Sequence, residues 1–427
     1  MTLGALKIGV SGLRVEGEAI GVVADNLANV NTPGFKRQRA EFEDVFNRGG
    51  GSNAFGSGVR LGGVGQAFTQ GSVVQTGLAT DLAINGEGLF IVGGSVNGLT
   101  GTFYSRAGQF HLDQSGTLVD PSGLMLMGKV LRADGTLSAG IAPLTVPTGS
   151  IPAQSTTALS LVANLDASDN PLPVPFDAQN PSSTSNLSAS LAVFDSLGAA
   201  HSLDLYFNNI GPGQWEYRAV VRGDELNPNQ PGSNVEVGSG TLSFTSDGAL
   251  DVFSETQPIS VDFAAATPGQ AIGVDFGAAI ADGGSGLAGT TQFSMAGGVS
   301  SQSQNGFAAG ALTGISVDAD GSMLGLYTNG RSVLVGQVQL AKFRALDSLA
   351  RAGNNLWVET PESGMATVSA PGSGGRGQLS AGSIESSNVD VGEEMVTMIQ
   401  HQRAFSASSK VLATADEMLS QLMQLKR

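Results

Sequence analysis

Residues 1–36 read MTLGALKIGVSGLRVEGEAIGVVADNLANVNTPGFK, and this stretch decides how the rest of the chain is organised. Large apolar residues recur every seven positions at Leu6, Leu13, Ile20 and Leu27. A second row, three positions earlier, consists of Leu3, Val10, Gly17 and Ala24. This a/d pattern predicts a helix that presents a coiled-coil seam.

The predicted helix ends abruptly near Asn29. Proline disfavours helix in the residue before it, and Pro-Gly is a strong turn signal, so Pro33-Gly34 predicts that the chain leaves in a new direction. We call residues 29–36 the corner turn, and its candidate functional residues are Asn29, Thr32, Pro33, Gly34 and Phe35.

Glycine weakens the predicted first helix. Its interior glycines are Gly4, Gly9, Gly12, Gly17 and Gly21. Each costs up to ~1 kcal/mol relative to alanine, so we expect the helix to form only when it is packed against a partner. Glycines also allow a neighbouring helix to approach closely, and the seam is predicted to face other subunits as much as its own chain.

A second heptad pattern occupies the other end of the chain. From 389 to 427 there is no proline, and Ser386, Ser387 and Asn388 are candidate N-caps. The predicted packing residues of this helix are Val391, Met398, Phe405, Leu412, Leu419 and Leu422. Two heptad helices separated by β signal predict that the two ends of the chain pair, antiparallel or side by side.

Short alternating segments separated by Gly, Asn-Gly and Asp-Gly turns predict β structure from residue 78 to about residue 365. The predicted fold is mainly β with α-helical termini: two β-barrel or sandwich-like bodies, the second inserted in the first, on paired coiled-coil helices. The predicted regions are a terminal helical domain (1–30 with 388–427), a connector (31–77 with 366–387), a first β domain (78–148 with 290–365) and an inserted outer β domain (149–289). Within the connector, 39–46 reads as a short helix or an extended segment.

Composition limits the classes of partner. The formal net charge is -16, which argues against nucleic acid, because proteins bind it by neutralising phosphates. Lys36-Arg37-Gln38-Arg39 is a basic cluster that acidic residues follow at once, so we interpret it as a solvated face. No run approaches the ~18 apolar residues of a membrane span, and the N-terminus lacks the apolar core of a secretory signal.

Residue types and spacings indicate no catalytic, cofactor or metal site. The chain has no cysteine, which excludes disulfides and thiolate chemistry. His111, His201 and His401 lack ligand-spaced neighbours, so structural roles are favoured. Asp318-Ala319-Asp320-Gly321 is similar to the start of a calcium loop, but position twelve of that loop is Asn329, so a hairpin turn is the better interpretation.

Four blocks of sequence resemble the rod and hook family of bacterial flagellar axial proteins. They are the N-terminal block 26–36 (NLANVNTPGFK), the second block 81–90 (DLAINGEGLF), the third block 104–110 (YSRAGQF) and a C-terminal block made of 385–391 (ESSNVDV) and 398–405 (MIQHQRAF). They stand in the family's order and cover both ends of the chain. The segments 194–203, 335–343 and 353–357 resemble the hook members in particular, whereas 400–404 and 409–410 are closer to the distal rod.

The resemblance implies a structural subunit rather than an enzyme. It implies export by the flagellar type III apparatus without leader cleavage, and polymerisation beneath a hook cap into a curved extracellular tube. The implied partners are other copies of the chain, the hook cap, the distal rod and the hook–filament junction proteins, with no cofactor, nucleic acid or membrane insertion. Two alternatives stay open at this point: a distal rod subunit, and a monomeric extracellular β adhesin or glycan-binding protein.

Overall fold

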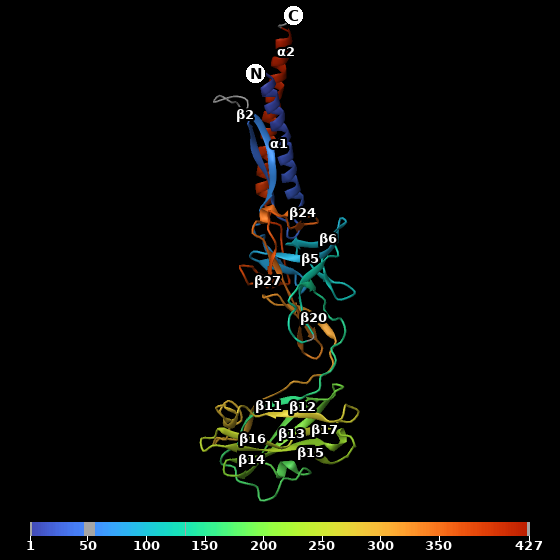
Figure 1. Ribbon diagram of the computed structural model, residues 1–427, viewed down its shortest axis with the longest axis vertical. Coiled ribbons are helices and arrows are strands. Elements are labelled where there is room, and N and C mark those ends of the chain that lie inside the picture. Colours follow the sequence, from blue (N-terminus) through green and yellow to red (C-terminus); the bar gives the residue numbers. More distant parts are fainter. Residues whose placement is uncertain (1, 47–55, 133, 425–427) are drawn as a thin grey trace. The chain divides into compact units, whose positions relative to one another are not determined.

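The computed structural model of this chain describes residues 2–46, 56–132 and 134–424 (Figure 1). The described chain divides into two compact units. Unit 1 comprises 1–148, 313–326 and 332–427, and unit 2 comprises 149–312 and 327–331. Unit 1 is therefore assembled from segments on both sides of the inserted unit 2.

Two long helices and a hairpin form one part of unit 1. The helices are α1 (Thr2–Ala28) and α2 (Val391–Gln424), and the hairpin consists of β1 (Gln38–Phe46) and β2 (Gly56–Gln66). The predicted end of the first helix near Asn29 agrees with the structure. Residues 39–46 are a strand, because β1 pairs with β2 along its length.

The β body of unit 1 is built around a sheet of 13 strands whose central order is β20-β21-β22-β9-β5-β6-β25-β24. The strands of this sheet are β5 (Leu89–Val96), β6 (Leu99–Ser105), β7 (His111–Leu112), β8 (Leu118–Val119), β9 (Met125–Val130), β10 (Ala142–Pro143), β20 (Leu312–Val317), β21 (Ser322–Tyr327), β22 (Ser332–Val338), β23 (Leu340–Lys342), β24 (Ala350–Gly353), β25 (Leu356–Val358) and β26 (Thr367–Ser369). Two small pairs accompany it: β28 (Ser383–Glu385) with β3 (Val73–Gln75), and β27 (Gln378–Ala381) with β4 (Leu82–Asn85). Asp318–Gly321 forms the turn between β20 and β21, as predicted, with the Gly321 N–H donating to the Asp318 carbonyl.

Aromatic side chains organise the core of this β body. Tyr104 and Phe343 meet edge to face, with ring centroids 4.7 Å apart. The buried Trp357 packs against Phe68 and donates its indole N–H to Gln66 Oε1 at 2.7 Å. Buried indoles usually have such an acceptor, and here it ties β2 to the core of the sheet through Gln66.

Unit 2 contains two sheets, in the orders β17-β18-β11-β19 and β12-β13-β14-β15-β16. Its strands are β11 (Ala158–Asn164), β12 (Leu187–Phe194), β13 (Ala200–Gly211), β14 (Gln214–Arg222), β15 (Asn234–Phe244), β16 (Leu250–Gln257), β17 (Ile259–Val261), β18 (Gln270–Asp275) and β19 (Gly298–Gln304). Burial alternates along β12, where Ala189, Leu191 and Val193 are buried and their neighbours face outward. This period of two is typical of a sheet with one buried face.

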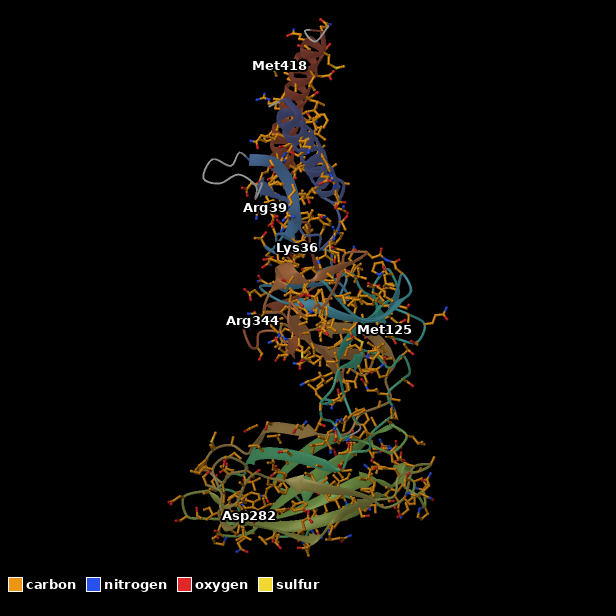
Figure 2. The ribbon with its side chains drawn as sticks, turned by 45° about the horizontal axis from the view of Figure 1, so that its top comes forward. Lys36, Arg39, Met125, Asp282, Arg344 and Met418 are labelled. Carbon is orange, nitrogen blue, oxygen red and sulfur yellow. The ribbon has the colours of Figure 1, made fainter. Side chains whose placement is uncertain are left out.

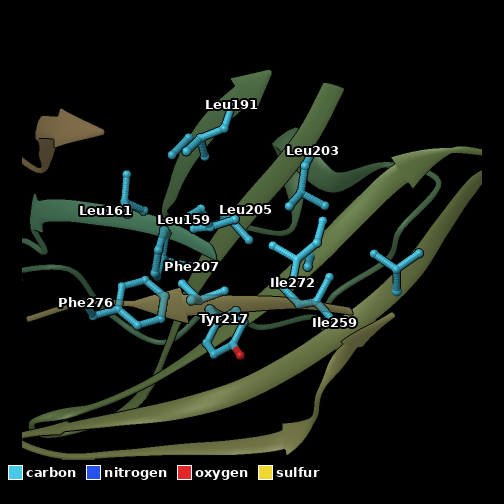
Figure 3. Close-up of a cluster of buried hydrophobic side chains, with 14 of the residues drawn as sticks. Leu159, Leu161, Leu191, Leu203, Leu205, Phe207, Tyr217, Ile259, Ile272 and Phe276 are labelled. Atoms are coloured by element: carbon cyan, nitrogen blue, oxygen red, sulfur yellow. The ribbon is translucent and has the colours of Figure 1, made fainter. Parts of the chain in front are cut away.

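Side chains from both sheets fill one core in unit 2 (Figure 3). Leu159 and Ile272 from one sheet meet Leu205, Phe207 and Tyr217 from the other. The two sheets therefore face each other, as in a sandwich.

Unit 2 extends beyond residue 289, the predicted C-terminal end of the inserted domain. β19 pairs antiparallel with β11, which places residues up to 312 in unit 2. The predicted start at residue 149 coincides with the first residue of the unit. The predicted division of the remaining chain into a helical domain, a connector and a first β domain stays a prediction.

Asp195 closes the turn between β12 and β13. Its Oδ1 accepts the backbone N–H groups of Leu197 and Ala199, both at 2.8 Å, and its Oδ2 lies 3.2 Å from His201 Nε2. Burial alone would raise the pKa of Asp195, but the Ala199 N–H, His201 and the Leu197 N–H together hold it below its usual value of 3.8.

The lowered pKa of Asp195 predicts an acid-dependent stability. A carboxyl whose pKa is lower in the folded state contributes stability above its unfolded pKa, and this contribution disappears as the pH falls through the folded pKa. We expect Asp195→Asn to lower the free energy of unfolding by about 1–2 kcal/mol at pH 7 and to flatten its decline below about pH 4.

The measurement is urea unfolding of the full chain, followed by the fluorescence of Trp215 in unit 2 with Trp357 replaced by phenylalanine. Asp224→Asn, which removes an exposed carboxylate, is the control and should retain the acid dependence of the parent. An Asp195→Asn curve that runs parallel to the parent at every pH would contradict this role for the carboxylate.

No helix in the described part of the chain is both long and apolar enough to cross a membrane.

Candidate functional site

The two ends of the chain pair as antiparallel helices (Figure 1). Gly12 of α1 faces Ser408, Glu16 Oε2 lies 2.7 Å from His401 Nδ1, and Asn26 Nδ2 lies 3.2 Å from Glu394 Oε2. Positions that increase along α1 meet positions that decrease along α2, so the helices run in opposite directions.

Two of the five glycines of α1 allow this close approach. An alanine at position 12 would place its Cβ 2.9 Å from Ser408 Oγ, and at position 9 it would touch the backbone of Ser408 and Leu412. Nothing lies within 4 Å of that position at Gly4, Gly17 or Gly21. Gly9 and Gly12 therefore serve the contact within the chain, whereas Gly17 and Gly21 leave an open surface.

The buried residues of α1 are not the predicted heptad. Val15, Ala19, Val23 and Asn26 are buried. Leu6, Leu13, Ile20 and Leu27 are half-buried, and Val10, Gly17 and Ala24 are exposed. The heptad row lies beside the contact with α2 because α1 turns its small residues, not its leucines, toward that helix.

The predicted packing residues of α2 lie on a similar flank. Val391 and Phe405 are exposed, and Met398, Leu412 and Leu419 are half-buried. The side chains of Leu3 and Leu422 lie outside the described residues. The structure does not gather the two predicted rows into one buried seam within the chain, and their packing against other subunits stays a prediction.

The β1–β2 hairpin packs against the helix pair. Ser11 Oγ accepts the Val59 N–H at 3.2 Å, which joins α1 to β2. The ring of Phe42 on β1 stacks over His401 on α2, with centroids 6.0 Å apart. Both helices are thereby joined to the hairpin.

A buried amide fixes the end of α1. Asn26 Oδ1 accepts the Gln38 N–H, and Asn26 Nδ2 donates to the Gln38 carbonyl, both at 2.8 Å. The same amide nitrogen reaches Glu394 on α2. Asn26 pairs with Gln38 as a strand backbone would, so one side chain connects α1, β1 and α2.

The corner turn is held by hydrogen bonds within itself and to the sheet. Thr32 Oγ1 donates to Asn29 Oδ1 at 3.1 Å, and the Pro33 carbonyl accepts from Asn355 Nδ2 at 2.9 Å. Phe35 is buried. All five predicted residues of the turn take part in one compact structure.

Gly34 is the tightest point of the turn. Its φ of +69° lies in the left-handed region, and an added Cβ would lie 2.4 Å from the Ala107 nitrogen and 2.5 Å from the Arg106 carbonyl carbon. Its N–H donates to the Glu385 carbonyl at 2.7 Å. Backbone atoms surround the position, so only glycine fits there without displacing the chain.

A buried ion cluster lies directly after the corner turn, and Figure 2 marks Lys36 at this place. Lys36 Nζ is 2.6 Å from Glu385 Oε1, and Arg106 Nη1 is 3.1 Å from Glu385 Oε2. Lys36 also donates to the Thr69 carbonyl, and Glu385 accepts the Gly71 N–H. We call Lys36, Arg106 and Glu385 the corner ion cluster.

Burial dominates the electrostatics of the corner ion cluster. The three residues are 2%, 5% and 0% exposed. Loss of water lowers the pKa of Lys36 and of Arg106, and the attraction of Glu385 opposes this for both. Two cations surround one carboxylate, so Glu385 is the group that makes their burial tolerable.

The interpretation of Lys36–Arg39 as a solvated face is therefore wrong for Lys36. Arg37 is also engaged: its Nη1 is 2.7 Å from Glu393 Oε1 and its Nε is 2.5 Å from Glu394 Oε1. Arg39 is exposed as predicted, with 80% of its side chain accessible. Lys36 and Arg37 differ from Arg39 because their partners lie far along the chain, and the local sequence does not identify such partners.

The four sequence blocks meet at the corner ion cluster. Lys36 ends the N-terminal block, Arg106 lies in the third, and Glu385 begins the C-terminal block. Arg106 also donates to the carbonyls of Ile84 and Gly86, which lie in the second block. Charged residues inside otherwise apolar or glycine-rich blocks were the signal that could have identified this cluster.

The N-cap of α2 is Asp390, not one of the predicted residues 386–388. Asp390 Oδ1 accepts the N–H of Glu393 at 3.0 Å, as an N-cap does. Asn388 binds the chain instead: its Oδ1 accepts the Arg37 N–H, and its Nδ2 donates to the Ala67 carbonyl. Asn388 thus ties the start of α2 to the segments that flank the hairpin.

The histidines lie in separate places. His401 pairs with Glu16, and His201 lies between Asp195 and Glu225 and stacks on Phe263. Among the described residues, no group of three or more histidine or acidic side chains is arranged to hold a metal ion.

Family comparisons cover most of the chain. Residues 6–36 match the flagella basal body rod protein family, and 83–160 match the flagellar hook protein FlgE/F/G D1 domain. Residues 164–307 match the flagellar basal body protein FlaE D2 domain, and 380–425 match the C-terminal region of the flagellar basal body rod FlgEFG proteins.

Whole proteins are similar over their full length. The flagellar hook protein FlgE of Escherichia coli K12 is 36% identical, over 99% of this chain and 100% of that protein. The FlgE proteins of Salmonella typhimurium and Treponema pallidum are 34% and 32% identical, over 98% and 99% of both chains. The crystal structure of Helicobacter pylori FlgE2 shares the fold, with a TM-score of 0.52 and 13% identity over 72% of this chain and 98% of that one.

Proposed function

Because the chain belongs to the flagellar hook protein FlgE family, we propose that it polymerises through its helix pair into the tubular hook that transmits torque from rod to filament. The observation that carries this proposal is the pairing of the two chain ends into antiparallel helices whose heptad rows stay half-buried or exposed within the chain. Apolar rows of this kind become buried when copies pack side by side.

The rows offer the residues for contact between subunits. On α1 they are Leu6, Val10, Leu13, Gly17, Ile20, Ala24 and Leu27, and on α2 they are Val391, Met398, Phe405, Leu412 and Leu419. Exposed apolar residues extend the surface on both helices, including Ile8 and Ile399 at 43% and 48% exposure. We infer that these helices line the inner tube.

The corner turn and the corner ion cluster fix the direction in which the helix pair leaves the β body. Buried and fully bonded polar groups define one geometry, because any other would leave charges unpaired. A subunit that transmits torque needs such a rigid connection. The proposed further partners are the hook cap, the distal rod and the hook–filament junction proteins. We propose that the chain reaches them after export by the type III apparatus without leader cleavage.

A hook subunit is favoured over a distal rod subunit. The match to the D2 domain at 164–307 corresponds to unit 2, and hook proteins align with this chain from end to end. The proposal assigns no catalytic activity, because the family is structural.

Deletion of either helix tests the proposal. We expect chains lacking 1–29 or 389–427 to remain soluble with a folded β body, because Lys36, Arg106 and Glu385 are retained, but to form no tubes. Tube formation is measured by electron microscopy and sedimentation, and folding by the fluorescence of Trp357. Tubes from either deleted chain would contradict the central role of the helices. The control is deletion of 425–427 alone, which should leave assembly intact.

A further inference from the structure

A groove runs between α1 and β2 in unit 1. Its volume is about 480 Å³, and its lining includes the apolar side chains of Val10, Val15 and Leu61 and the cationic side chains of Lys7, Arg14 and Arg60. An apolar floor with a basic rim is unusual in a chain whose formal net charge is -16.

The cations of the rim remain available to a partner. Arg14 pairs with Glu18 and Arg60 with Glu43, but the arginine side chains are 80% and 70% exposed. Exposed pairs of this kind contribute little, so a new acidic partner can compete for these arginines. The groove therefore fits an acidic segment with apolar side chains.

The C-terminal segment 416–424 of α2 has this chemistry. Asp416 and Glu417 are exposed, and Met418 and Met423 are 44% and 76% exposed. Figure 2 marks Met418 near the end of α2, and Figure 1 shows that α2 extends beyond the start of α1. Ala415 is buried and Leu419 is half-buried, so the segment is covered in part and leaves Glu417 and Met418 exposed.

The groove is out of reach of the α2 of its own chain. Lys7, Arg14 and Glu18 line the groove, whereas Gly9, Gly12 and Glu16 face α2. At 100° per residue these two rows lie on opposite sides of α1. An α2 segment in the groove must therefore come from another copy.

We propose that segment 416–424 of one copy docks into the α1–β2 groove of a second copy, with Glu417 against the basic rim and Met418 on the apolar floor. The segment, about 12 Å long, is shorter than the groove, to which positions 6 to 18 of α1 contribute about 18 Å. Segment and groove are different surfaces, so the contact is head-to-tail and extends into a helical assembly.

This inference rests on the proposed self-assembly and adds the contact that drives it. The chain has no cysteine, so a pair can be introduced without background. In Arg14→Cys combined with Glu417→Cys, oxidation of the assembled full chain is expected to form disulfides between copies, seen as a ladder of multimers on a non-reducing gel. The matched control is Arg39→Cys combined with Glu417→Cys. It places the first cysteine on β1 outside the groove and should give no ladder.

A second experiment tests the contact by charge reversal. Arg14→Glu, or Asp416→Lys with Glu417→Lys, is expected to raise the concentration needed for polymerisation at least about tenfold. The combined triple variant should return to within about threefold of the parent, because the charges are again opposite. Arg39→Glu should leave assembly unchanged, and thermal unfolding checks that every variant is folded.

The outcomes distinguish a failure of the groove assignment from a failure of the proposed function. If the unmodified chain forms no polymer, the proposed function fails. If it polymerises but the Arg14–Glu417 cysteine pair gives no ladder, or links only within one chain, the groove assignment is overturned while the proposed function stands. A ladder together with rescue by the triple variant supports the assignment.

Discussion

Gly34→Ala is expected to destabilise unit 1 by about 3 kcal/mol or more. The methyl group would lie 2.4 Å from the Ala107 nitrogen and 2.5 Å from the Arg106 carbonyl carbon, in a backbone conformation with φ of +69°. Left-handed conformation alone costs a residue with a side chain roughly 1–2 kcal/mol, and overpacking adds roughly 1–3 kcal/mol. The neighbours are backbone atoms of the residues that directly follow β6, so they cannot turn aside as a flexible side chain would.

The sequence contains two tryptophans, and each unit holds one, Trp215 in unit 2 and Trp357 in unit 1. Urea unfolding followed by Trp357 fluorescence, in a chain with Trp215 replaced by phenylalanine, therefore reports on unit 1.

Gly98→Ala is the matched control for Gly34→Ala. Gly98 also has a positive φ, +81°, but nothing lies within 4 Å of its Cβ position. We expect this control to lower the free energy of unfolding by only about 1–2 kcal/mol, the conformational part of the effect. Equal losses for the two variants would show that the close approach to 106–107 does not contribute.

Glu385→Gln is expected to have a comparably large effect, about 3–5 kcal/mol on the stability of unit 1. The substitution removes the carboxylate that lies between Lys36 and Arg106, and both cations stay buried without a counter-charge. The Trp357 assay measures the loss.

The reference for Glu385→Gln is an ion pair on the surface. Arg60 and Glu43 are 70% and 50% exposed, and Glu43→Gln should cost less than about 1 kcal/mol. Adding Lys36→Met to Glu385→Gln should recover part of the lost stability, because one of the two unpaired charges is then removed. If Glu385→Gln costs no more than Glu43→Gln, the corner ion cluster does not stabilise unit 1.

Much of the fold follows from local sequence. Pro33-Gly34 predicts where α1 ends, and the alternation of Ala189, Leu191 and Val193 predicts a strand with one buried face. The end of unit 2 could not be placed because β19, with the sequence GVSSQSQ, is polar and mostly exposed. A strand without apolar alternation carries no signal, and only its pairing with β11 identifies it.

The candidate site was predicted in part. The heptad leucines correctly indicate a helix, but a seven-residue repeat does not specify which neighbour it faces. The small residues Gly9 and Gly12 decide the contact with α2, and they contribute little to a hydrophobic pattern. The corner ion cluster was missed because Lys36 and Glu385 are 349 positions apart. The sequence around either residue does not indicate that the other is its partner.

The separation of Lys36 and Glu385 also has a kinetic consequence. Contacts between distant residues form slowly, because the entropy of closing the intervening loop must be lost before the contact stabilises the chain. The core of unit 2 lies within 149–331 and needs neither end of the chain. Unit 2 can therefore fold early, whereas the corner ion cluster of unit 1 forms only once Glu385 contacts Lys36 and Arg106. The two helices belong to opposite ends of the chain, so their pairing also comes late, and any contact that needs the completed helix pair must wait for it.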